Sequence, residues 1–578
     1  MPRPALPNLP LKKTMRGKMN INRRTMLGAA AILTASAATA APAGAAIRKS
    51  GGGRSHGKAL EKLQAYAEQH RADWGLPGMT VCVVDKEGFT GFVTSGLANI
   101  DKKVPVGPDH LFQIGSISKM FAALTLWSIF EEGKLSPETP LVDALPGLKV
   151  KDGAAIQLQH VLDHTSGLPG DAPVVSELGL WSGYAPGSHW SYSNTGYELL
   201  GLIIANADGR TYPESVAARV LEPLGMDQSI GAMRVFDRDR YATGYEPAYS
   251  DRTSLRPGPL APAPWVDSDS AAGCIAATAG DMTKFMQFLL GLAEGKGGPV
   301  LSDAGAMKFL ANPADAPGWS PGVKYGNGIA RVEIDGRPFL HHTGGMVSFV
   351  SSLHVDTETG VAAFSSANIG YPSGYRPKDM TIFACKLIHA MKSNGEEPEP
   401  KETKPTVENP ERFSGVFTAA NGDTIEIAAG KDSLALHRDG VESRMQPVVE
   451  TGFACEAPEF AVTGLVFDLE EDKAVRVWAG EVEYAADPSA GFKPPAPADL
   501  SALAGVYQSD DAWSGPISIY ARDGALWVGN VEQLVQSPSG DWGFGDESSP
   551  EKLRFDGVLA GRPHRLLLSG FPYYRRFS

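Results

Sequence analysis

The chain has 578 residues, of which 43% are hydrophobic and 21% are charged, the composition of an ordinary folded protein with room for roughly three or four domains. Its formal net charge is −13, which argues against a nucleic-acid partner and against binding to anionic membrane surfaces. Solvated acidic faces account for this charge.

The first predicted segment is an export signal over residues 1–45. Arg23 and Arg24 precede an apolar, alanine-rich run that extends from Met26 to about Ala46. This pattern resembles a bacterial twin-arginine signal, and the small residues near its end fit a cleavage site. No later run is long and apolar enough to span a membrane. We therefore expect a mature protein that is periplasmic or secreted, with no stable membrane span after the signal is removed.

The next informative pattern is Ser116-Ile117-Ser118-Lys119, which opens the helical run from Met120 to Phe130. Residues three apart share a helix face, so Ser116 and Lys119 point the same way and Ser118 does not. A serine hydroxyl is a poor nucleophile until a base takes its proton. Lysine can be that base only if its pKa falls from about 10.4 toward neutrality, which requires roughly 4–5 kcal/mol from the environment. The apolar residues around this helix predict the burial that would supply it.

Two further motifs follow along the chain. Tyr192-Ser193-Asn194 contains a tyrosine that a neighbouring lysine can push toward its phenolate, and an amide that can hold both the lysine and a substrate carbonyl. His342-Thr343-Gly344-Gly345 follows a strand-like segment, and its glycines let a strand edge lie close to a ligand backbone. The backbone amides of Ser116 and Gly345 are the predicted donors of an oxyanion hole.

In this order, S-x-x-K, Y-x-N and H-T-G resemble the motifs of the serine β-lactamase and penicillin-binding-protein superfamily. The resemblance is to its class C-like branch, which includes D-aminopeptidases, DD-peptidases and carboxylesterases. Residues 160–169 and 273–282 also resemble family segments, and the resemblance covers roughly residues 58–393. It implies an α+β fold of the β-lactamase/transpeptidase-like type. In that fold an antiparallel sheet is flanked by helices, an all-helical subdomain lies beside it, and the site is in the cleft between them.

The resemblance also implies a role for each motif residue. Ser116 is the expected acylated nucleophile and Lys119 the general base. Tyr192 is the expected proton relay, first to the leaving group and later from water. The expected substrate-binding or positional residues are Asn194, His342, Thr343 and Gly344. No cofactor and no metal are expected.

The histidine of the third motif departs from the family pattern, in which a lysine usually helps to bind a substrate carboxylate. Histidine at neutral pH is mostly uncharged, so His342 can donate a hydrogen bond but attracts an anion less. This favours substrates without a carboxylate next to the scissile bond, namely esters, amides, or peptides cut from the amino end. The departure does not exclude β-lactams.

Other patterns have simpler interpretations. Two G-x-S-x-G matches, at 53–57 and 318–322, lie in glycine- or proline-rich stretches without the strand and helix of a nucleophile elbow. Tyr325-Gly326-Asn327 repeats the Y-x-N pattern but leads into a predicted strand, so we expect it to be structural. His160 and His164 are four apart, as in some metal pairs, but without H-E-x-x-H we expect packing or capping roles. Buried, mostly unpaired thiols are expected at Cys82, Cys274, Cys385 and Cys455.

The catalytic domain is predicted at 46–394, followed by a charged, proline-rich linker at 395–410. Beyond it, short alternating runs predict two antiparallel β-barrel-like domains, at 411–491 and 500–578. A proline-rich linker at 492–499 separates them.

The two C-terminal domains share a sequence repeat. Phe413-Ser414-Gly415-Val416-Phe417 matches Leu503-Ala504-Gly505-Val506-Tyr507, and two later strand-like runs match at nearly the same offset. Barrel closure would remove exposed strand edges. This layout resembles the D-aminopeptidase branch, in which the barrels help to shape the substrate cleft. The alternative is a stabilising, dimerising or partner-binding appendage, and the sequence by itself favours this alternative.

Together, the patterns and the resemblance predict a serine hydrolase that acts through an acyl-enzyme on amide or peptide bonds, D-amino-acid substrates first. A carboxylesterase is the next alternative, followed by a β-lactamase or DD-carboxypeptidase. The non-enzyme alternative is a penicillin-binding or peptidoglycan-sensing protein without turnover, and the intact Ser-Lys-Tyr set argues against it. The expected partner is a small peptide, amide or ester substrate. A homodimer is compatible with the sequence, and no nucleic acid is expected.

Overall fold

A computed structural model of the protein describes residues 48–50, 54–249, 252–253, 255–370, 374–401, 404–529, 532–544 and 549–576. The predicted export signal, residues 1–45, lies outside the described residues. Within them, no helix combines the length and the apolar character that crossing a membrane requires.

The predicted catalytic domain is organised around an antiparallel sheet, which has ten strands among the described residues. Its hydrogen-bonded order is β1-β3-β2-β16-β15-β14-β13-β12-β11, with β4 paired to β3. The strands are β1 (Arg48–Ser50), β2 (Gly78–Asp85), β3 (Thr90–Asn99), β4 (Val104–Pro105), β11 (Ala314–Asp315), β12 (Lys324–Gly326), β13 (Ile329–Ile334), β14 (Arg337–Gly345), β15 (Val350–Asp356) and β16 (Val361–Ala367). The third sequence motif therefore forms the end of β14.

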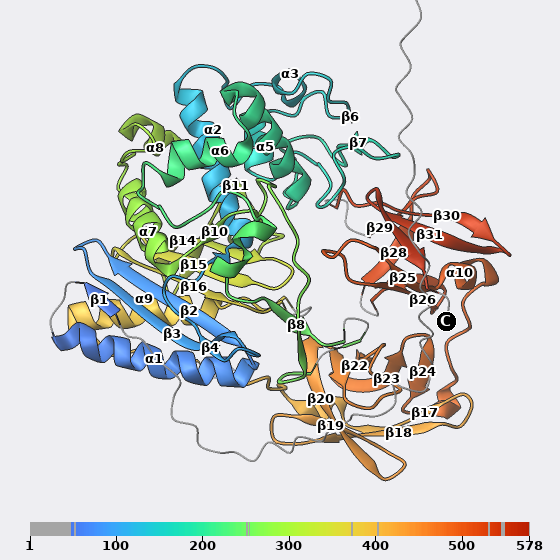
Figure 1. Ribbon diagram of the computed structural model, residues 1–578. Coiled ribbons are helices and arrows are strands. Elements are labelled where there is room, and N and C mark those ends of the chain that lie inside the picture. Colours follow the sequence, from blue (N-terminus) through green and yellow to red (C-terminus); the bar gives the residue numbers. More distant parts are fainter. Residues whose placement is uncertain are drawn as a thin grey trace, which may run out of the picture. The chain divides into compact units, whose positions relative to one another are not determined.

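The central strands are buried on both faces because helices cover each side of the sheet. Side chains alternate along a strand, so neighbours in β2 face opposite cores. Val81 packs in the core with α1 (Arg54–Trp74) and α9 (Lys378–Ser393), whereas Cys82 packs in the core that contains the helical subdomain. Figure 1 shows α1 and α9 on one side of the sheet and α7 (Ala279–Ala293) on the other. The predicted α+β architecture is confirmed.

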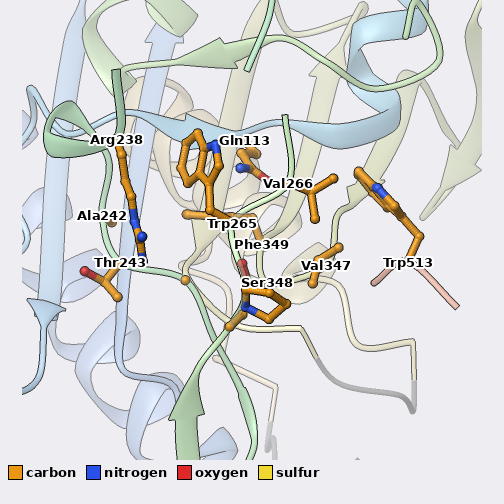
Figure 2. A pocket seen from close by; sticks show the side chains of 13 residues that line it. Gln113, Arg238, Ala242, Thr243, Trp265, Val266, Val347, Ser348, Phe349 and Trp513 are labelled. Atoms are coloured by element: carbon orange, nitrogen blue, oxygen red, sulfur yellow. The ribbon is translucent and has the colours of Figure 1, made fainter. Parts of the chain in front are cut away.

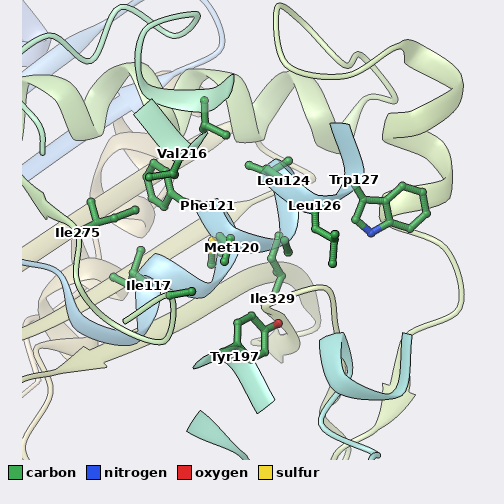
Figure 3. Close-up of a cluster of buried hydrophobic side chains, with 14 of the residues drawn as sticks. Ile117, Met120, Phe121, Leu124, Leu126, Trp127, Tyr197, Val216, Ile275 and Ile329 are labelled. Carbon is green, nitrogen blue, oxygen red and sulfur yellow. The ribbon is translucent and has the colours of Figure 1, made fainter. Parts of the chain in front are cut away.

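The helical subdomain is built around α2, the helix that follows Ser116. Its helices are α2 (Ser118–Glu131), α3 (Leu141–Ala144), α4 (Leu158–Leu162), α5 (Asn194–Asp208), α6 (Tyr212–Val216) and α8 (Asp303–Phe309). Figure 3 shows Met120, Phe121 and Leu124 of α2 inside a cluster of buried side chains contributed by several elements. The predicted burial of this helix is confirmed, and it encloses Lys119 as well.

Short elements tie the loops to these layers. The paired strands are β5 (Phe112–Gln113) with β10 (Ala276–Ala277), β6 (Val150–Lys151) with β7 (Leu180–Trp181), and β8 (Tyr245–Pro247) with β9 (Leu260–Pro262). The helical turns are η1 (Gly115–Ile117), η2 (Ala217–Leu221), η3 (Val235–Arg240), η4 (Pro410–Phe413) and η5 (Pro488–Ala490). Because β10 pairs with β5, the segment that ends at Ala277 lies next to the turn that carries Ser116.

The C-terminal region forms two closed barrels of eight antiparallel strands each, counted over the described residues. The first contains β17 (Gly415–Ala419), β18 (Thr424–Ala429), β19 (Leu434–Arg438), β20 (Val441–Val449), β21 (Gly452–Cys455), β22 (Leu465–Glu470), β23 (Lys473–Ala479) and β24 (Val482–Ala485). The second follows α10 (Ala498–Leu503) and contains β25 (Gly505–Gln508), β26 (Ile517–Arg522), β27 (Ala525–Val528), β28 (Glu532–Gln536), β29 (Trp542–Phe544), β30 (Leu553–Leu559), β31 (Arg562–Leu568) and β32 (Phe571–Arg575). The prediction of two barrel-like domains is confirmed.

The sequence repeat marks equivalent positions in the two barrels. Gly415 and Gly505 begin the first strand of each barrel with φ near 155° and 154°, a backbone conformation that favours glycine. Two residues later, Phe417 and Tyr507 are fully buried in their respective cores.

The remaining sequence patterns that lie within the described residues have structural roles, as predicted. The match at 318–322 lies in turns between two short strands, not between a strand and a helix, and the match at 53–57 lies partly outside the described residues. The His160 side chain accepts a hydrogen bond from the Gln157 amide at the start of α4, while His164 packs among aromatic rings. All four cysteines are buried and without a disulfide bond: Cys82, Cys274, Cys385 and Cys455.

Candidate active site

Ser116 lies in the helical turn η1, where β14 passes very close to the backbone. Gly115 has a φ of 56°, and a Cβ atom at that position would lie 2.6 Å from the backbone nitrogen of Gly345. Only glycine satisfies both conditions. This close approach brings the first and third motifs side by side, and Ser116 stays partly exposed there.

Lys119 connects the first two motifs. Its Nζ atom lies 3.3 Å from Ser116 Oγ, 2.6 Å from Asn194 Oδ1 and 2.9 Å from the carbonyl oxygen of Ala272. The side chain is completely buried. The amine therefore has a fixed position beside the hydroxyl that it would have to deprotonate.

Burial lowers the pKa of Lys119 to about 7, and the carboxylates of Asp171 and Glu198 partly oppose this shift. A large fraction of the amine is then neutral at neutral pH. This environment therefore gives Lys119 the near-neutral pKa that it needs to act as a base beside Ser116. The arrangement can transfer a proton from Ser116 to Lys119.

The Tyr192 hydroxyl is buried, and its ring lies over Lys119, with 4.8 Å between Nζ and the ring centroid. Burial raises the pKa of Tyr192, and the neighbouring Ser116 and Arg376 offset only part of this effect. The expectation that the lysine pushes this tyrosine toward its phenolate is therefore wrong, because the loss of solvation outweighs the nearby positive charge. Tyr192 is protonated at neutral pH and can relay a proton as a neutral hydroxyl.

His342 is buried beneath the site, and both ring nitrogens face groups of the protein. Nε2 lies 2.9 Å from the Tyr325 hydroxyl, and Nδ1 lies 2.6 Å from the Thr343 carbonyl oxygen. Burial and the nearby Lys119 lower the pKa of His342 well below its usual value, so the ring is neutral. Nδ1–H then donates to Thr343 and Nε2 accepts from Tyr325.

This geometry bears on the expected roles of two residues. His342 was expected to bind or position the substrate, and its two ring nitrogens face Tyr325 and the Thr343 carbonyl oxygen, which leaves a positional role through Tyr325 and β14 as the prediction. Tyr325, expected to be structural, is buried and contacts the site through His342, while Asn327 of the same Y-x-N pattern accepts a hydrogen bond from Trp127.

The glycines of β14 allow the strand to lie against the serine turn and the following loop. A Cβ atom on Gly344 would collide with the carbonyl oxygen of Ile114, and one on Gly345 would collide with the Arg376 guanidinium. Thr343 lies on the same strand, opposite Ser352 in β15. Ser116 and Gly345 both line the cavity described below, as donors of an oxyanion hole must.

Arg376 is a site residue that the sequence did not reveal. It follows β16 in the loop before α9, and no motif surrounds it. Its guanidinium lies against Gly345 and its charge acts on the pKa of both Tyr192 and His342. A cation from another segment therefore lies beside the third motif, although Arg376 is not among the residues that line the cavity described below.

A cavity of about 740 Å³ opens beside Ser116. Among the described residues, the charged side chains that line it are all carboxylates: Asp171, Glu198, Asp511 and Glu551. Much of the remaining lining is apolar and comes from the second barrel, through Trp513, Phe544, Leu568, Phe571 and Tyr573. The second barrel therefore forms part of the cleft wall. The sequence had not decided between this role and that of an appendage.

A second, smaller cavity of about 30 Å³ also involves the second barrel. Figure 2 shows Trp265 and Gln113 in its wall, with Trp513 entering from a separate segment. Trp513 lines both cavities. The volume suits a water molecule and not a substrate.

The carboxylates around Lys119 lead to a prediction about pH dependence. Asp171→Asn keeps the oxygen that accepts from Asn194 Nδ2 at 2.8 Å but removes a negative charge that raises the Lys119 pKa. The acidic limb of the activity profile should move to lower pH, by roughly half a unit or more, because Lys119 then loses its proton more readily. The measurement is kcat/KM against pH for p-nitrophenyl acetate, which has no amine of its own to titrate.

Glu198→Gln serves as an independent check of the same cause. This carboxylate also raises the Lys119 pKa, so the limb should move in the same direction. A limb that stays in place or moves to higher pH in both variants would contradict the assignment of this limb to Lys119.

Comparison with known proteins places this geometry in context. Penicillin-binding protein 4 of Amycolatopsis lactamdurans is 28% identical over 343 residues, which cover 55% of this chain and 87% of that protein. The octameric penicillin-binding protein homologue from Pyrococcus abyssi has a TM-score of 0.53 at 21% identity, over 74% of this chain and 99% of that one. The D-amino acid amidase from Ochrobactrum anthropi SV3 in complex with D-phenylalanine has a TM-score of 0.47 at 25% identity, over 58% and 98%.

The antiparallel sheet between helices, with a serine–lysine pair at the start of a buried helix, defines a protein of the β-lactamase/transpeptidase-like superfamily. A family model described as Beta-lactamase matches residues 63–383, more than half of the chain. The chain belongs to this family, whose members are mostly serine hydrolases.

Proposed function

We propose that the protein is a serine hydrolase that forms an acyl-enzyme and cleaves amide or peptide bonds of substrates with a free amino group, D-amino-acid derivatives first. The observation that carries this proposal is the set of carboxylates in the cavity beside Ser116. A protonated amine is the substrate group that such a lining attracts most strongly. The layout of a catalytic domain followed by two barrels, which resembles the D-aminopeptidase branch, supports the choice of D-stereochemistry.

The proposed reaction begins when Ser116 Oγ attacks the substrate carbonyl carbon and its proton moves to Lys119 Nζ. The backbone amides of Ser116 and Gly345 stabilise the oxyanion that forms. A proton then passes from Lys119 through the Tyr192 hydroxyl to the leaving nitrogen, the C–N bond breaks, and the amine departs. The acyl group remains as an ester on Ser116.

Deacylation uses the same groups in reverse order. Water attacks the ester carbonyl while its proton passes through Tyr192 to Lys119. The second tetrahedral intermediate collapses, Ser116 Oγ recovers a proton, and the carboxylic acid leaves. Asn194 keeps the lysine in place throughout, since its Oδ1 lies 2.6 Å from Nζ.

The experiment that tests the proposal compares D-alanine p-nitroanilide with its L-enantiomer and with N-acetyl-D-alanine p-nitroanilide. We expect the D-amide to be cleaved and the acetylated one at least about 100-fold more slowly, because acetylation removes the positive charge. Equal rates for the two D-substrates would remove the role of the carboxylates. Preference for the L-enantiomer would overturn the stereochemical choice, and no amide cleavage would favour the carboxylesterase alternative.

A second candidate function, binding or hydrolysis of β-lactams or carboxyl-terminal peptides, is favoured by Arg376. An uncharged His342 disfavours such substrates because it attracts a carboxylate only weakly. His342 is indeed neutral, but the Arg376 guanidinium lies against the same strand at Gly345. A substrate carboxylate near this strand would therefore meet a cation after all.

Arg376→Gln separates the two candidates. If carboxylate substrates are used, this variant should hydrolyse nitrocefin, or become acylated by benzylpenicillin, about tenfold more slowly, because one charge-assisted hydrogen bond is lost. Hydrolysis of p-nitrophenyl acetate, which has no carboxylate, should change less than about threefold. An equal loss with both substrates would mean that Arg376 only supports β14.

Export to the periplasm or the medium is also part of the proposal, on the basis of Arg23 and Arg24. Their replacement by two lysines should keep the full-length protein in the cytoplasm of a bacterial host. Export that continues unchanged would argue against a twin-arginine route.

A further inference from the structure

A short segment of the second barrel, Pro550–Lys552, packs directly on the catalytic domain. The Trp181 indole N–H donates to the Pro550 carbonyl oxygen at 2.9 Å, and Lys552 Nζ lies 4.5 Å from the centroid of the Trp181 ring. Gly183 leaves room for this contact, since a Cβ atom there would lie 2.7 Å from Pro550 Cα. The residue between these two contacts is Glu551.

The Glu551 carboxylate joins the two domains. Its Oε1 accepts from the backbone N–H of Gly170 at 2.5 Å, and its Oε2 accepts from the Ser569 hydroxyl. Ser569 is buried in the barrel and its Oγ in turn accepts from the Lys552 amide at 3.2 Å. The carboxylate is therefore fixed from the barrel side and directed at one peptide group of the catalytic domain.

The carbonyl group of the same residue, Gly170, contacts the second motif. The Gly170 carbonyl oxygen accepts from the backbone N–H groups of Asn194 at 2.7 Å and Thr195 at 3.0 Å, the first two residues of α5. Asn194 Oδ1 then accepts from Lys119 Nζ at 2.6 Å. Glu551 is thus connected to the amine by way of two residues, Gly170 and Asn194.

We infer that Glu551 is a positioning residue of the active site: through Gly170 it holds the first turn of α5, and with it the Asn194 amide, against Lys119. The inference rests on the proposed role of Lys119 as the base. The second barrel would then position the catalytic groups, in addition to forming a wall of the cleft. A hydrogen-bonded chain of this kind transmits the position of each group to the next.

Two conservative substitutions in the full-length protein separate position from charge. Glu551→Gln keeps the reach to Gly170 and loses the charge, whereas Glu551→Asp keeps the charge and is one methylene too short. For p-nitrophenyl acetate, Glu551→Gln should lose less of kcat/KM than Glu551→Asp, because the amide oxygen can still accept from the Gly170 N–H. Glu551→Asp should lose about tenfold, since displacing a catalytic group by about 1 Å is costly.

The pH profile supplies a readout that loose docking of the barrel would not change. When Asn194 Oδ1 moves away, the protonated form of Lys119 loses a hydrogen bond, so its pKa falls. The acidic limb of kcat/KM should move to lower pH in Glu551→Asp, although the charge at residue 551 is unchanged. The inference would be overturned if the acidic limb of Glu551→Asp stayed at the wild-type pH, or if Glu551→Gln lost as much activity as Glu551→Asp.

Glu177→Gln is the matched control for interdomain contact. Glu177 is exposed and pairs with Arg565 of the second barrel at 3.3 Å, away from the path through Gly170. This variant should keep both the rate and the pH profile; if it shows the losses of Glu551→Asp, the effect is one of docking and the inference fails.

Labelling with a fluorophosphonate probe distinguishes this outcome from failure of the proposed function. A wild-type protein that neither reacts with the probe nor cleaves the ester contradicts the proposed function, and the inference falls with it. An active wild type with an equally active Glu551→Asp variant contradicts the inference alone.

Discussion

Replacing Ser116 by alanine should reduce turnover of every substrate by about four powers of ten or more, because the atom proposed to carry the acyl group is removed. Ser116 Oγ lies 3.3 Å from Nζ of Lys119, whose pKa is about 7, and Ser116 lines the cavity. The measurement is steady-state hydrolysis of p-nitrophenyl acetate, together with intact-protein mass spectrometry after reaction with a fluorophosphonate. The variant should show neither hydrolysis above background nor the mass increase.

Two other serines provide matched controls for this experiment. Ser118 belongs to the same motif, but it is buried and its Oγ accepts from the Ile275 amide at 3.1 Å. Ser320 belongs to the G-x-S-x-G pattern and lies in a turn. Ser118→Ala should lose less than about tenfold in rate, and Ser320→Ala should keep full activity. A mass increase that persists in Ser116→Ala and disappears in either control would move the nucleophile to that serine.

The parts of the site that the sequence predicted well depend on local spacing. Ser116 and Lys119 are three residues apart, so the helix itself directs them to one face. Tyr192 lies in the loop just before the N-cap of α5 and Asn194 is the first residue of this helix, so the short Y-x-N spacing keeps the two side chains close together. The barrels were predictable for a similar reason, because strand alternation and the repeat at Gly415 and Gly505 are short-range signals.

The electrostatics of the site could not be read from spacing. The prediction of a phenolate at Tyr192 took account only of the neighbouring lysine. Burial raises the pKa of this tyrosine and has the larger effect. The same is true of His342, whose ring nitrogens are oriented by Tyr325 and by its own strand. How deeply a side chain is buried is set by the packing of distant elements, and a motif carries no information about it.

Long-range contacts are the second part that the sequence did not predict. Glu551 and Gly170 are 381 residues apart and belong to different domains, and neither lies in a recognisable pattern. Arg376 approaches Gly345 from a loop that has no motif of its own. Such residues can be identified only from the three-dimensional structure. The sequence therefore did not predict the proposed roles of Glu551 and Arg376.

Replacing Lys119 should have the second largest effect, and the choice of replacement tests its role. Lys119→Arg keeps a positive charge but cannot give up its proton near neutral pH, and Lys119→Met keeps the apolar stem without a charge. If the lysine acts as the base, both variants should be acylated about a thousandfold more slowly or worse, since general base catalysis contributes about 10²–10⁴-fold. Pre-steady-state acylation by p-nitrophenyl acetate measures this step directly.

The alternative role for Lys119 is that of a fixed cation that stabilises negative charge. In that case Lys119→Arg would retain most of the rate and only Lys119→Met would fail. The wild-type pH profile distinguishes the roles independently: a base with a pKa of about 7 is active above that pH and inactive below it, whereas a required cation gives the opposite slope. Activity that rises through pH 7, with Lys119→Arg as impaired as Lys119→Met, assigns the proton transfer to this amine. The desolvation that lowers the pKa of Lys119 would then be the main source of its reactivity.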